Sequence, residues 1–360
     1  MGWRYFSVGT VTWDDKVELY AADSTGGQAI GGGESGTSTF FVKDPKVAEP
    51  MTWARIAPLE RVLVAEWDGN AVYAGFILEV DEDLDAGIVT IQHTDVWWIW
   101  AFRYLLNIHG NGAQTASDVT FSNLTLATLA NKIVAKGLQA EPADRYSLPM
   151  IFTADVAGAN SRRYEGFKFT SVEDALDEVM KTNGGPDVAF DVRWGPGTTA
   201  LQWVMRSGAL TTGKWEWDAT APKTEVSRIK FKTDASKVTN KVIGAGEGSE
   251  RNILVRDDSS FNTTAPALER VESYSGMSDA GQLQARVTAD LNAHNNPTQQ
   301  LSFRIPVTGA VKVGDLILGG TCRVKTSGIY GLSAGWHEWR LIKFTFDRTW
   351  IYLQMQQIGG

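Results

Sequence analysis

Residues 238–251 read VTNKVIGAGEGSER, and they open a stretch, residues 238–297, around which the rest of the chain is organised. The apolar alternation before the glycines predicts a buried strand, and the run Gly244–Gly248 predicts a turn. Ile253 begins a second apolar run and therefore a second predicted strand. A helix over Asp279–His294 is predicted next, because apolar residues recur there at helical spacing before a proline. The stretch is thus a scaffold of two strands, a turn and a helix.

The glycine run has a second interpretation, a turn that binds phosphate. A dinucleotide site needs a helix directly after the glycines, because the amide groups at the helix N-terminus bind the pyrophosphate. Here Ile253-Leu254-Val255 predicts another strand instead. We therefore expect a structural turn in which glycine permits positive φ. No cofactor is predicted.

The composition predicts a globular protein of several domains. At 360 residues the chain is too long for one ordinary core and predicts two or three domains. Its hydrophobic fraction of 43% and charged fraction of 21% exclude a disordered chain. The net charge of -8 argues against nucleic-acid binding by phosphate neutralisation, which needs clustered lysine and arginine, so no sequence-specific nucleic-acid partner is expected. It also argues against adsorption to an anionic membrane. An acidic surface would suit a protein past which DNA has to slide.

The single cysteine, the N-terminus and the apolar runs exclude further classes of protein. The single cysteine, Cys322, excludes an internal disulfide framework and a multi-cysteine zinc site. The N-terminus lacks the charged and apolar regions of a signal peptide. The most apolar run, residues 96–102, is much shorter than the ~20 residues that a membrane-spanning helix needs. We therefore expect synthesis in a cytoplasm and no membrane insertion.

Alternating apolar residues predict strands along most of the chain. Residues 61–95 predict a three-stranded meander, whose first hairpin turns at Asp68-Gly69-Asn70. Residues 23–38 are rich in glycine, serine and threonine and predict a mobile surface loop, because such side chains bury little apolar area. Further strands are predicted at residues 3–20, 188–194, 200–206, 226–232, 301–307, 316–318, 322–324, 338–346 and 350–356.

Two more helices are predicted before the opening stretch. Residues 125–136 place leucine, isoleucine and valine on one face, and Gly137 follows at the C′ position. Residues 171–183 begin with a capping pattern at Ser171. In the later helix, Ser278 is the expected cap.

The second hairpin carries a candidate cation site, Asp81, Asp83 and Asp85. A calcium loop of the EF-hand type requires glycine at the sixth position and glutamate at the twelfth, where this chain has Ala86 and Gln92. A solvated hairpin tip is therefore the preferred interpretation, and a bound cation is the alternative. No other metal site is predicted, since the histidines lack the spacing of zinc ligands.

No catalytic site is predicted. The chain has no Gly-x-Ser-x-Gly motif, and Cys322 lies in a predicted strand, where nothing activates its thiol. Glycoside hydrolysis requires only two carboxylates, so Glu165, Glu216 and Asp218 stay open candidates beside aromatic residues. Nothing in the sequence selects a pair among them.

The 14 tryptophans are unusually frequent, and seven of them lie in three clusters. Tryptophan combines a large apolar area with one N–H group and is a preferred anchor of protein interfaces. We therefore prefer core and subunit interface over sugar binding for these residues, and neighbours on a strand would point to opposite faces. The interface candidates are Trp97, Trp98, Trp100, Trp215, Trp217, Trp336 and Trp339.

Several short motifs are spread over the chain: WDG at 67–69, NKVIGAGEG at 240–248, ILV at 253–255, LERVE at 268–272, ADL at 289–291 and VGD at 313–315. Together they resemble the minor tail proteins, or baseplate tail-hub proteins, of long-tailed, siphovirus-like phages, especially those of actinobacterial hosts. The resemblance implies a β-rich α+β fold with two β-barrel-like domains and an intervening α/β domain. Residues 1–112 would form the first barrel, residues 113–206 and 240–300 the middle domain, and residues 207–239 and 301–360 the second barrel.

The resemblance also implies a function without catalysis. Such proteins form rings, commonly trimers, at the distal end of the tail tube, and the genome passes through them during ejection. The implied partners are further copies of the chain, the distal tail protein, the C-terminus of the tape-measure protein and other minor tail or receptor-binding proteins. The implied location is the virion tail tip, after synthesis in the host cytoplasm. No hydrolase or fibre domain follows the last predicted strands, which argues further against an enzyme.

An alternative function is kept open. The chain would then be a cell-wall glycan-binding or glycan-hydrolysing module of the tail tip, with tryptophans such as Trp98 lining a sugar groove.

Overall fold

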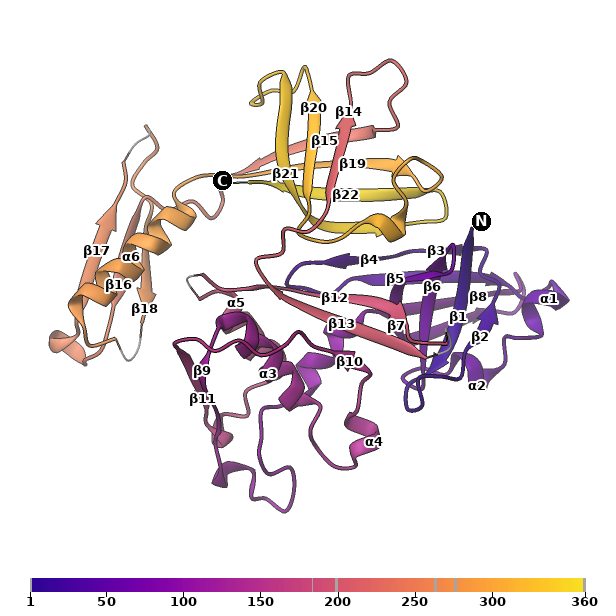
Figure 1. Ribbon diagram of the computed structural model, residues 1–360, viewed down its shortest axis with the longest axis horizontal. Helices are drawn as coiled ribbons and strands as arrows, with labels where there is room; N and C mark the ends of the chain where they lie inside the picture. The colour runs from indigo at the N-terminus through magenta and orange to yellow at the C-terminus, as the bar shows by residue number, and fades with distance from the viewer. Residues whose placement is uncertain (1, 183, 198–199, 262–263, 275–276, 359–360) are drawn as a thin grey trace. The chain divides into compact units, whose positions relative to one another are not determined.

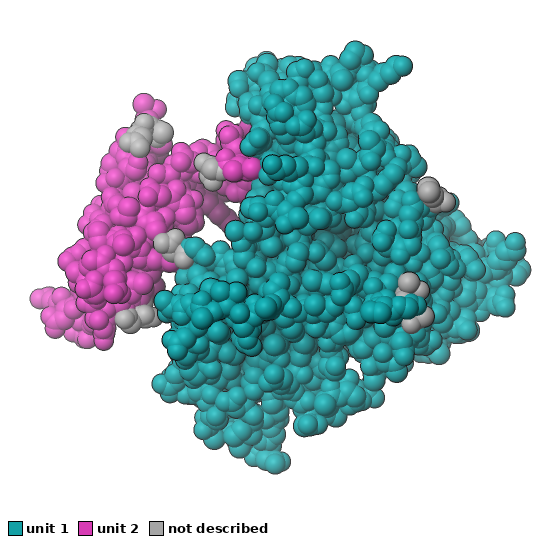
Figure 2. Space-filling view, in the orientation of Figure 1, with its two compact units in different colours: residues 1–228, 303–355 teal, residues 229–302, 356–360 magenta. Residues whose placement is uncertain are grey.

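The computed structural model describes residues 2–182, 184–197, 200–261, 264–274 and 277–358. They form two compact units, which Figure 2 distinguishes by colour. Unit 1 comprises residues 1–228 and 303–355, and unit 2 comprises residues 229–302 and 356–360. The chain therefore leaves unit 1, builds most of unit 2 and returns. Figure 1 shows the elements of each unit.

The first sheet of unit 1 has the strand order β2-β1-β6-β7-β8-β5-β3. The two strands at the ends of this order, β2 and β3, are consecutive in the chain. Leu19 of β2 pairs with Tyr5, whereas Asp23 of β3 pairs with Thr39 on the opposite edge. One bent segment thus pairs with both edges of this sheet, which we call the barrel below. The strands are β1 (Trp3–Gly9), β2 (Val17–Leu19), β3 (Asp23–Ser24), β5 (Ser35–Phe41), β6 (Arg61–Trp67), β7 (Asn70–Asp83) and β8 (Ile88–Thr94).

The predicted meander over residues 61–95 is confirmed as β6, β7 and β8. Its first turn has positive φ at Asp68 (48°) and Gly69 (88°), the conformation that an Asp-Gly hairpin turn favours. The barrel core is filled by side chains from its own strands and by Ile56 of a short helix, α2 (Trp53–Ile56). The core residues are Leu19, Phe40, Ile56, Leu63, Ile77, Val89 and Ile91.

The prediction of a mobile loop over residues 23–38 is wrong, because this segment is ordered by backbone pairing. It contains β3, β4 (Gly26–Ala29) and the start of β5. Strand β4 pairs antiparallel with β21 (Gly335–Phe346), a strand of the second sheet. The glycines that suggested disorder allow this approach instead, since a Cβ on Gly27 would collide with the carbonyl oxygen of Phe344.

The second sheet has the order β14-β20-β21-β22-β19-β15, with β4 attached to β21. Its strands confirm the predictions at residues 226–232, 301–307, 322–324, 338–346 and 350–356. Residues 316–318, by contrast, form no strand: they follow a short 3₁₀ turn, η5 (Val313–Asp315), and their apolar side chains enter the core from irregular backbone. The strands not yet given are β14 (Lys214–Asp218), β15 (Ser227–Asp234), β19 (Thr298–Pro306), β20 (Thr321–Thr326) and β22 (Trp350–Gln357).

An α/β layer packs against the outer wall of the barrel within unit 1. The predicted helices are confirmed as α3 (Leu126–Gly137) and α5 (Val172–Met180), with Thr125 and Ser171 as caps; predicted residue Asn183 lies outside the described residues. Gly137 is the last helical residue and not the residue beyond the cap. The predicted hairpin is β12 (Asp187–Trp194) and β13 (Leu201–Gly208), beside β10 (Met150–Ile151). The smaller elements are α1 (Pro45–Ala48), η2 (Gln114–Ala116), β9 (Val119–Leu124), α4 (Ala143–Tyr146), β11 (Asn160–Tyr164) and η3 (Gly166–Lys168).

The tryptophan-rich segment after β8 is a 3₁₀ helix, η1 (Val96–Phe102), and not a strand. Asp95 starts it by accepting a hydrogen bond from the Trp97 amide at 3.0 Å. The argument that neighbouring tryptophans face opposite sides of a strand therefore does not apply. Instead, Trp97 and Trp100 both enter the core between the barrel wall and the α/β layer.

In unit 2, β16 (Lys241–Ala245) is the central strand of a sheet with the order β17-β16-β18. The helix α6 (Ala280–His294) contributes Leu283, Val287 and Leu291 to a small core with Val242. Asp279 caps this helix, in place of the predicted Ser278, because its side chain accepts a hydrogen bond from the Gln282 amide. The remaining elements are η4 (Glu250–Asn252), β17 (Val255–Ser259) and β18 (Glu269–Ser273).

The glycine run of unit 2 serves helix packing more than turning. Only Gly248 has positive φ, at 125°. A Cβ on Gly244 would collide with the Val287 side chain of α6, and one on Gly246 would lie 2.6 Å from the Met277 carbonyl oxygen. A strand, β17, does follow the glycines as predicted, but only after η4, and it begins at Val255 and not at Ile253.

We expect Gly27→Ala to destabilise unit 1 by about 2 kcal/mol or more, because the new methyl group has to push the β21 backbone away. Gly32→Ala is the matched control, since it lies in the same segment with no atom within 4 Å of the added Cβ. The midpoint of urea unfolding, followed by tryptophan fluorescence, measures both. Equal midpoints for the two variants would show that the β4–β21 approach is not constrained.

Candidate functional site: the junction of the two sheets and the exposed aromatic surfaces

Aromatic side chains join the barrel to the second sheet where β4 meets β21. Trp3 stacks on Phe346 with ring centroids 4.6 Å apart, and Tyr73 meets the same ring edge-on at 6.1 Å. Gly26 lies between Tyr73 and Phe346, because an added Cβ would be 2.9 Å from one ring and 3.0 Å from the other. Arg348 then donates a hydrogen bond to the Ala22 carbonyl at 2.7 Å. The two sheets therefore share one apolar seam.

Two basic side chains link the second sheet to the rest of unit 1. Arg206 of β13 holds both carboxylate oxygens of Asp191 at 2.5 and 3.0 Å and donates to the Leu318 carbonyl at 3.0 Å. Lys343 of β21 pairs with Glu34 at 2.6 Å. The bidentate arginine is the stronger of these contacts, since planar pairing fixes both groups.

A buried polar chain crosses the barrel beside the junction. The hydroxyl of Tyr73 lies 2.9 Å from His93 Nδ1, and Ser38 Oγ lies 3.0 Å from Nε2. Ser38 is bonded in turn to Ser24 at 2.7 Å. A neutral imidazole satisfies both partners, with one donor and one acceptor nitrogen. Burial lowers the pKa of His93 to about 3, so the ring is neutral over the physiological range.

Asp95 lies near this chain of hydrogen bonds, and its pKa shifts in the direction opposite to that of His93. Burial raises its pKa to about 7, although hydrogen bonds from the Glu34 and Trp97 amides favour the ionised form. Its carboxylate accepts from these amides at 2.8 and 3.0 Å. Asp95 therefore ties the β4–β5 segment to the start of η1.

Glu66 joins the barrel to the α/β layer. Its side chain is 3% exposed and lies 3.2 Å from Lys16 Nζ. The indole N–H of Trp194 donates to Glu66 at 2.8 Å, and the Lys16 ammonium sits 3.6 Å from the Trp194 ring. A buried carboxylate is thus compensated by a hydrogen bond and by a cation, as burial of a charge requires.

The tryptophan candidates divide between core and surface. Four of them are buried: Trp97, Trp100, Trp217 and Trp339. Trp98 and Trp215 are partly buried, and Trp215 lies over Gly213 and Gly320. Trp336 is 40% exposed, and Arg323 stacks on its ring at 4.7 Å. Only the partly buried and exposed members are accessible in a single copy of the chain, and whether they meet another subunit stays a prediction.

The acidic hairpin does not gather its carboxylates. Asp81 and Asp83 lie on β7 and Asp85 in the turn, and all three are exposed. Asp83 accepts a hydrogen bond from the Ala86 amide at 2.8 Å, so it stabilises the turn. Within residues 2–182 and the other described ranges, no group of three side chains is arranged to hold a metal ion.

The open carboxylate candidates are engaged in ion pairs and hydrogen bonds. Glu216 pairs with Arg323 at 3.0 Å, and Glu165 pairs with Lys168 at 2.8 Å. Hydrogen bonds from Thr220 and Lys325 lower the pKa of Asp218 to about 2. A general acid needs a raised pKa, so Asp218 is unsuited to that role.

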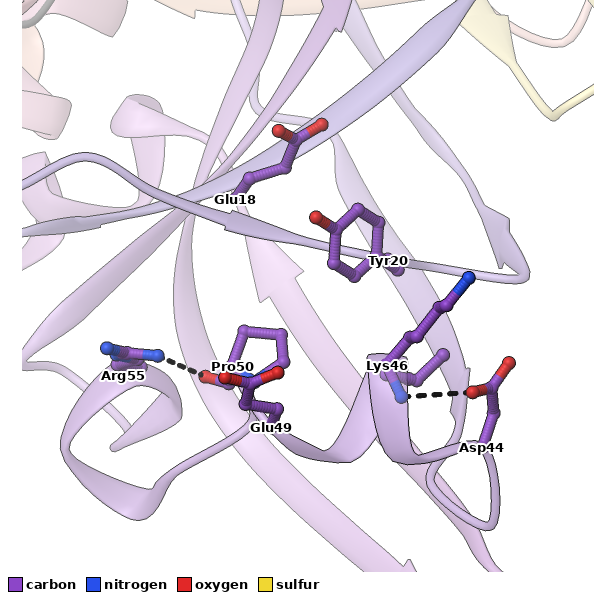
Figure 3. A pocket seen from close by; sticks show the side chains of 8 residues that line it. Glu18, Tyr20, Asp44, Lys46, Glu49, Pro50 and Arg55 are labelled. Carbon is purple, nitrogen blue, oxygen red and sulfur yellow. Dashed lines mark hydrogen bonds between the residues drawn. The ribbon is translucent and has the colours of Figure 1, made fainter.

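Sequence reasoning missed a pocket of about 600 Å³ at one end of the barrel. It lies between β2 and the α1–α2 segment, and Figure 3 shows Glu18 and Tyr20 from the strand side with Lys46 and Glu49 from the helical side. Two segments that are separate in the chain, residues 18–20 and 44–55, build it, so no local sequence motif predicts it. Trp53 of the same α2 helix is 66% exposed.

No helix among the described residues is long and apolar enough to span a membrane.

The neutral His93 leads to a prediction about acid. Below its ordinary pKa of 6.5, the unfolded chain binds a proton at this ring and the folded chain does not, down to a pKa of about 3. As the pH falls from 6 to 4, the free energy of unfolding should therefore decrease by about 1.4 kcal/mol per pH unit because of this residue. Unfolding free energies of wild type and His93→Gln, measured against pH, give this slope as their difference.

His337→Gln is the control, because His337 is half-buried and its ring nitrogen Nε2 lies 2.7 Å from the Ser333 carbonyl oxygen. Parallel pH profiles for wild type and His93→Gln would contradict a buried neutral ring. The opposite titration of Asp95 is present in both proteins and cancels in the difference.

Comparison with known proteins places this geometry in a structural group. No protein-family model and no curated protein matches the sequence. Among solved structures, the tail protein from Neisseria meningitidis MC58 aligns with 100% of this chain and 98% of its own, at 13% identity and a TM-score of 0.62. The 43 kDa tail protein of prophage MuSo2 from Shewanella oneidensis covers 98% of both chains at 11% identity, with a TM-score of 0.62.

Prophage tail protein gp18 from Listeria monocytogenes EGD-e covers 99% of this chain and 95% of its own, at 10% identity and a TM-score of 0.54. The agreement extends over nearly the whole length of each chain, so it includes both sheets and the elements between them. The protein has the β-rich fold of prophage tail proteins.

Proposed function

We propose that this chain is a structural virion protein, the central hub at the distal end of a phage tail. The observation that carries the proposal is the shared fold over almost the full length of two tail proteins. The internal architecture supports it, because the pairing of β4 with β21 joins the barrel and the second sheet into one continuous wall. Such a wall suits a ring subunit, whose neighbours have to meet at fixed angles.

The proposed hub is a trimer that joins the tail tube and the distal tail protein to the C-terminus of the tape-measure protein and to tip proteins. Its domains would follow the expected division, with barrels at residues 1–112 and at 207–239 with 301–360. Residues 113–206 and 240–300 would be the middle domain. The acidic balance of -8 supports passage of DNA, because a lumen without excess positive charge does not retain phosphates.

A role without catalysis is part of the proposal. The candidate carboxylates are engaged in surface ion pairs, and burial raises the pKa of the Cys322 thiol to about 12. A thiol of that kind is a core residue and not a nucleophile. The alternative of a sugar groove lined by tryptophans is not favoured, since four of the seven candidates are buried.

The oligomeric state tests the proposal directly. Mass photometry of the purified chain, or of the protein released from isolated tail tips, should show a species of about three times 39.4 kDa. Antibody labelling of virions should mark the distal end of the tail. A chain that stays monomeric and is missing from virions would contradict the hub.

Two tryptophans of β21 separate folding from association. Trp339→Ala should cost about 3–5 kcal/mol of unfolding free energy, because Trp339 is fully buried (0% exposed). Trp336→Ala should change stability by less than about 1 kcal/mol, since this ring is exposed, yet it should shift the trimer towards smaller species. Thermal unfolding and mass photometry of both variants give the two readings. A trimer unaffected by Trp336→Ala would remove Trp336 from the proposed interface.

A further inference from the structure

The pocket at the end of the barrel exists because the barrel wall divides there. Strand β2 pairs with β1, and the chain then bends after Leu19 so that β3 pairs with β5. The α1–α2 segment packs on the barrel core next to this division through Val47 and Ile56. A cavity of about 600 Å³ is left between them. Cavities of ~300–1,000 Å³ are the usual size of small-molecule sites.

Intramolecular contacts hold much of the lining in place without a ligand. Arg4 grips both oxygens of Glu18 at 2.9 and 2.7 Å and thereby lowers the pKa of that carboxyl. Asp44 accepts a hydrogen bond from the Lys46 amide at 3.0 Å, and Arg55 donates to the Pro50 carbonyl at 3.3 Å. These groups are preorganised, so a ligand would not have to order them.

Other polar groups of the lining are unused. Among the described residues, no hydrogen-bond or ion-pair partner is present for the Glu49 carboxylate, the Lys46 ammonium or the Tyr20 hydroxyl. Figure 3 shows these three side chains around the same opening. The lining therefore offers one free acceptor, one free donor and one hydroxyl that serves as either.

The balance of charge in the lining restricts the ligand class. Three carboxylates, from Glu18, Asp44 and Glu49, would repel a phosphate or a polyanion. Lys46 and Arg55 would repel a polycation in the same way. A neutral ligand that carries both hydrogen-bond donors and acceptors is repelled neither by the carboxylates nor by the two basic side chains. The half-exposed ring of Tyr20 (51%) adds a flat apolar face beside these polar groups.

From this combination we propose that the barrel pocket binds a neutral saccharide. The hydroxyl groups of a sugar ring would form hydrogen bonds with Glu49, Lys46 and the Tyr20 hydroxyl. The C–H face of the sugar ring would lie on an apolar wall of the pocket. The site uses none of the seven tryptophan candidates and requires only unit 1. The proposal is independent of the tail-hub role, because it concerns one barrel of one subunit.

Ligand-observed NMR and calorimetry on the full chain test it. The probes are glucose, galactose, N-acetylglucosamine and its β-1,4-linked disaccharide, together with glucosamine as a cation and glucuronate as an anion. At least one neutral sugar should bind with a Kd on the order of 1 mM or below, and glucuronate and glucosamine should bind more weakly than glucose. Tyr20→Ala and Glu49→Gln should each weaken binding by about fivefold or more.

Matched controls keep the result specific. Tyr330→Ala removes a fully exposed tyrosine (100%), and Glu82→Gln removes a carboxylate of the acidic hairpin; neither residue lines the pocket. Both controls should bind the sugar as wild type does, and circular dichroism should show that all four variants are folded.

The proposal is overturned if no neutral sugar binds up to its solubility, or if Tyr20→Ala and Glu49→Gln bind the sugar as wild type does. Tighter binding of glucuronate or glucosamine than of every neutral sugar would also overturn it. Each of these results would leave the mass and the virion location of the chain, and hence the hub proposal, unaffected.

Discussion

The structure of unit 1 depends on how closely two backbones approach each other at Gly26 and Gly27. A side chain at either position would meet the rings of Tyr73 and Phe346 or the backbone of β21. Because both residues lack a Cβ, β4 pairs with β21 and lies against the aromatic seam. The remaining contacts of the junction, including the Lys343–Glu34 pair and the Arg348 hydrogen bond, form on this register. The conformational entropy of the glycines is offset by the pairing that they permit.

Closure of the barrel follows a similar logic, since a short bent segment replaces a full strand. Leu19 is buried on β2, and three residues later the chain has turned far enough for the Ala22 amide to donate to the Thr39 carbonyl on the opposite edge. Because this segment is so short, the barrel wall is incomplete on one side, and the helices α1 and α2 cover the gap. The pocket beside Glu18 and Tyr20 is therefore a consequence of how the barrel closes, not a separate feature added to it.

Much of the local structure could be predicted from the sequence, because local rules determine it. The Asp68-Gly69 turn, the meander and the helices α3 and α5 follow from turn chemistry, alternation and capping. Elements that depend on distant partners could not be predicted. Residues 23–38 look disordered until β21 is present to pair with them, and η1 looks like a strand because its apolar residues pack on a layer more than twenty residues away in the chain. The core positions of Trp97 and Trp100, like the pocket, exist only once several segments meet.

The opening stretch shows why a motif and its physical role can differ. Glycines after a strand suggest a phosphate turn, yet Gly244 and Gly246 are required by the close packing of α6 and of the Met277 backbone. A close approach of this kind requires glycine at one position and leaves its neighbours free to vary. Most other core positions demand only an apolar side chain of suitable size, and such cores tolerate many sequences as long as volume and pattern are kept. Two chains can therefore share this fold over their whole length while few of their residues coincide. The similarity of two such chains is then visible in how their strands pair, although their sequences share few residues.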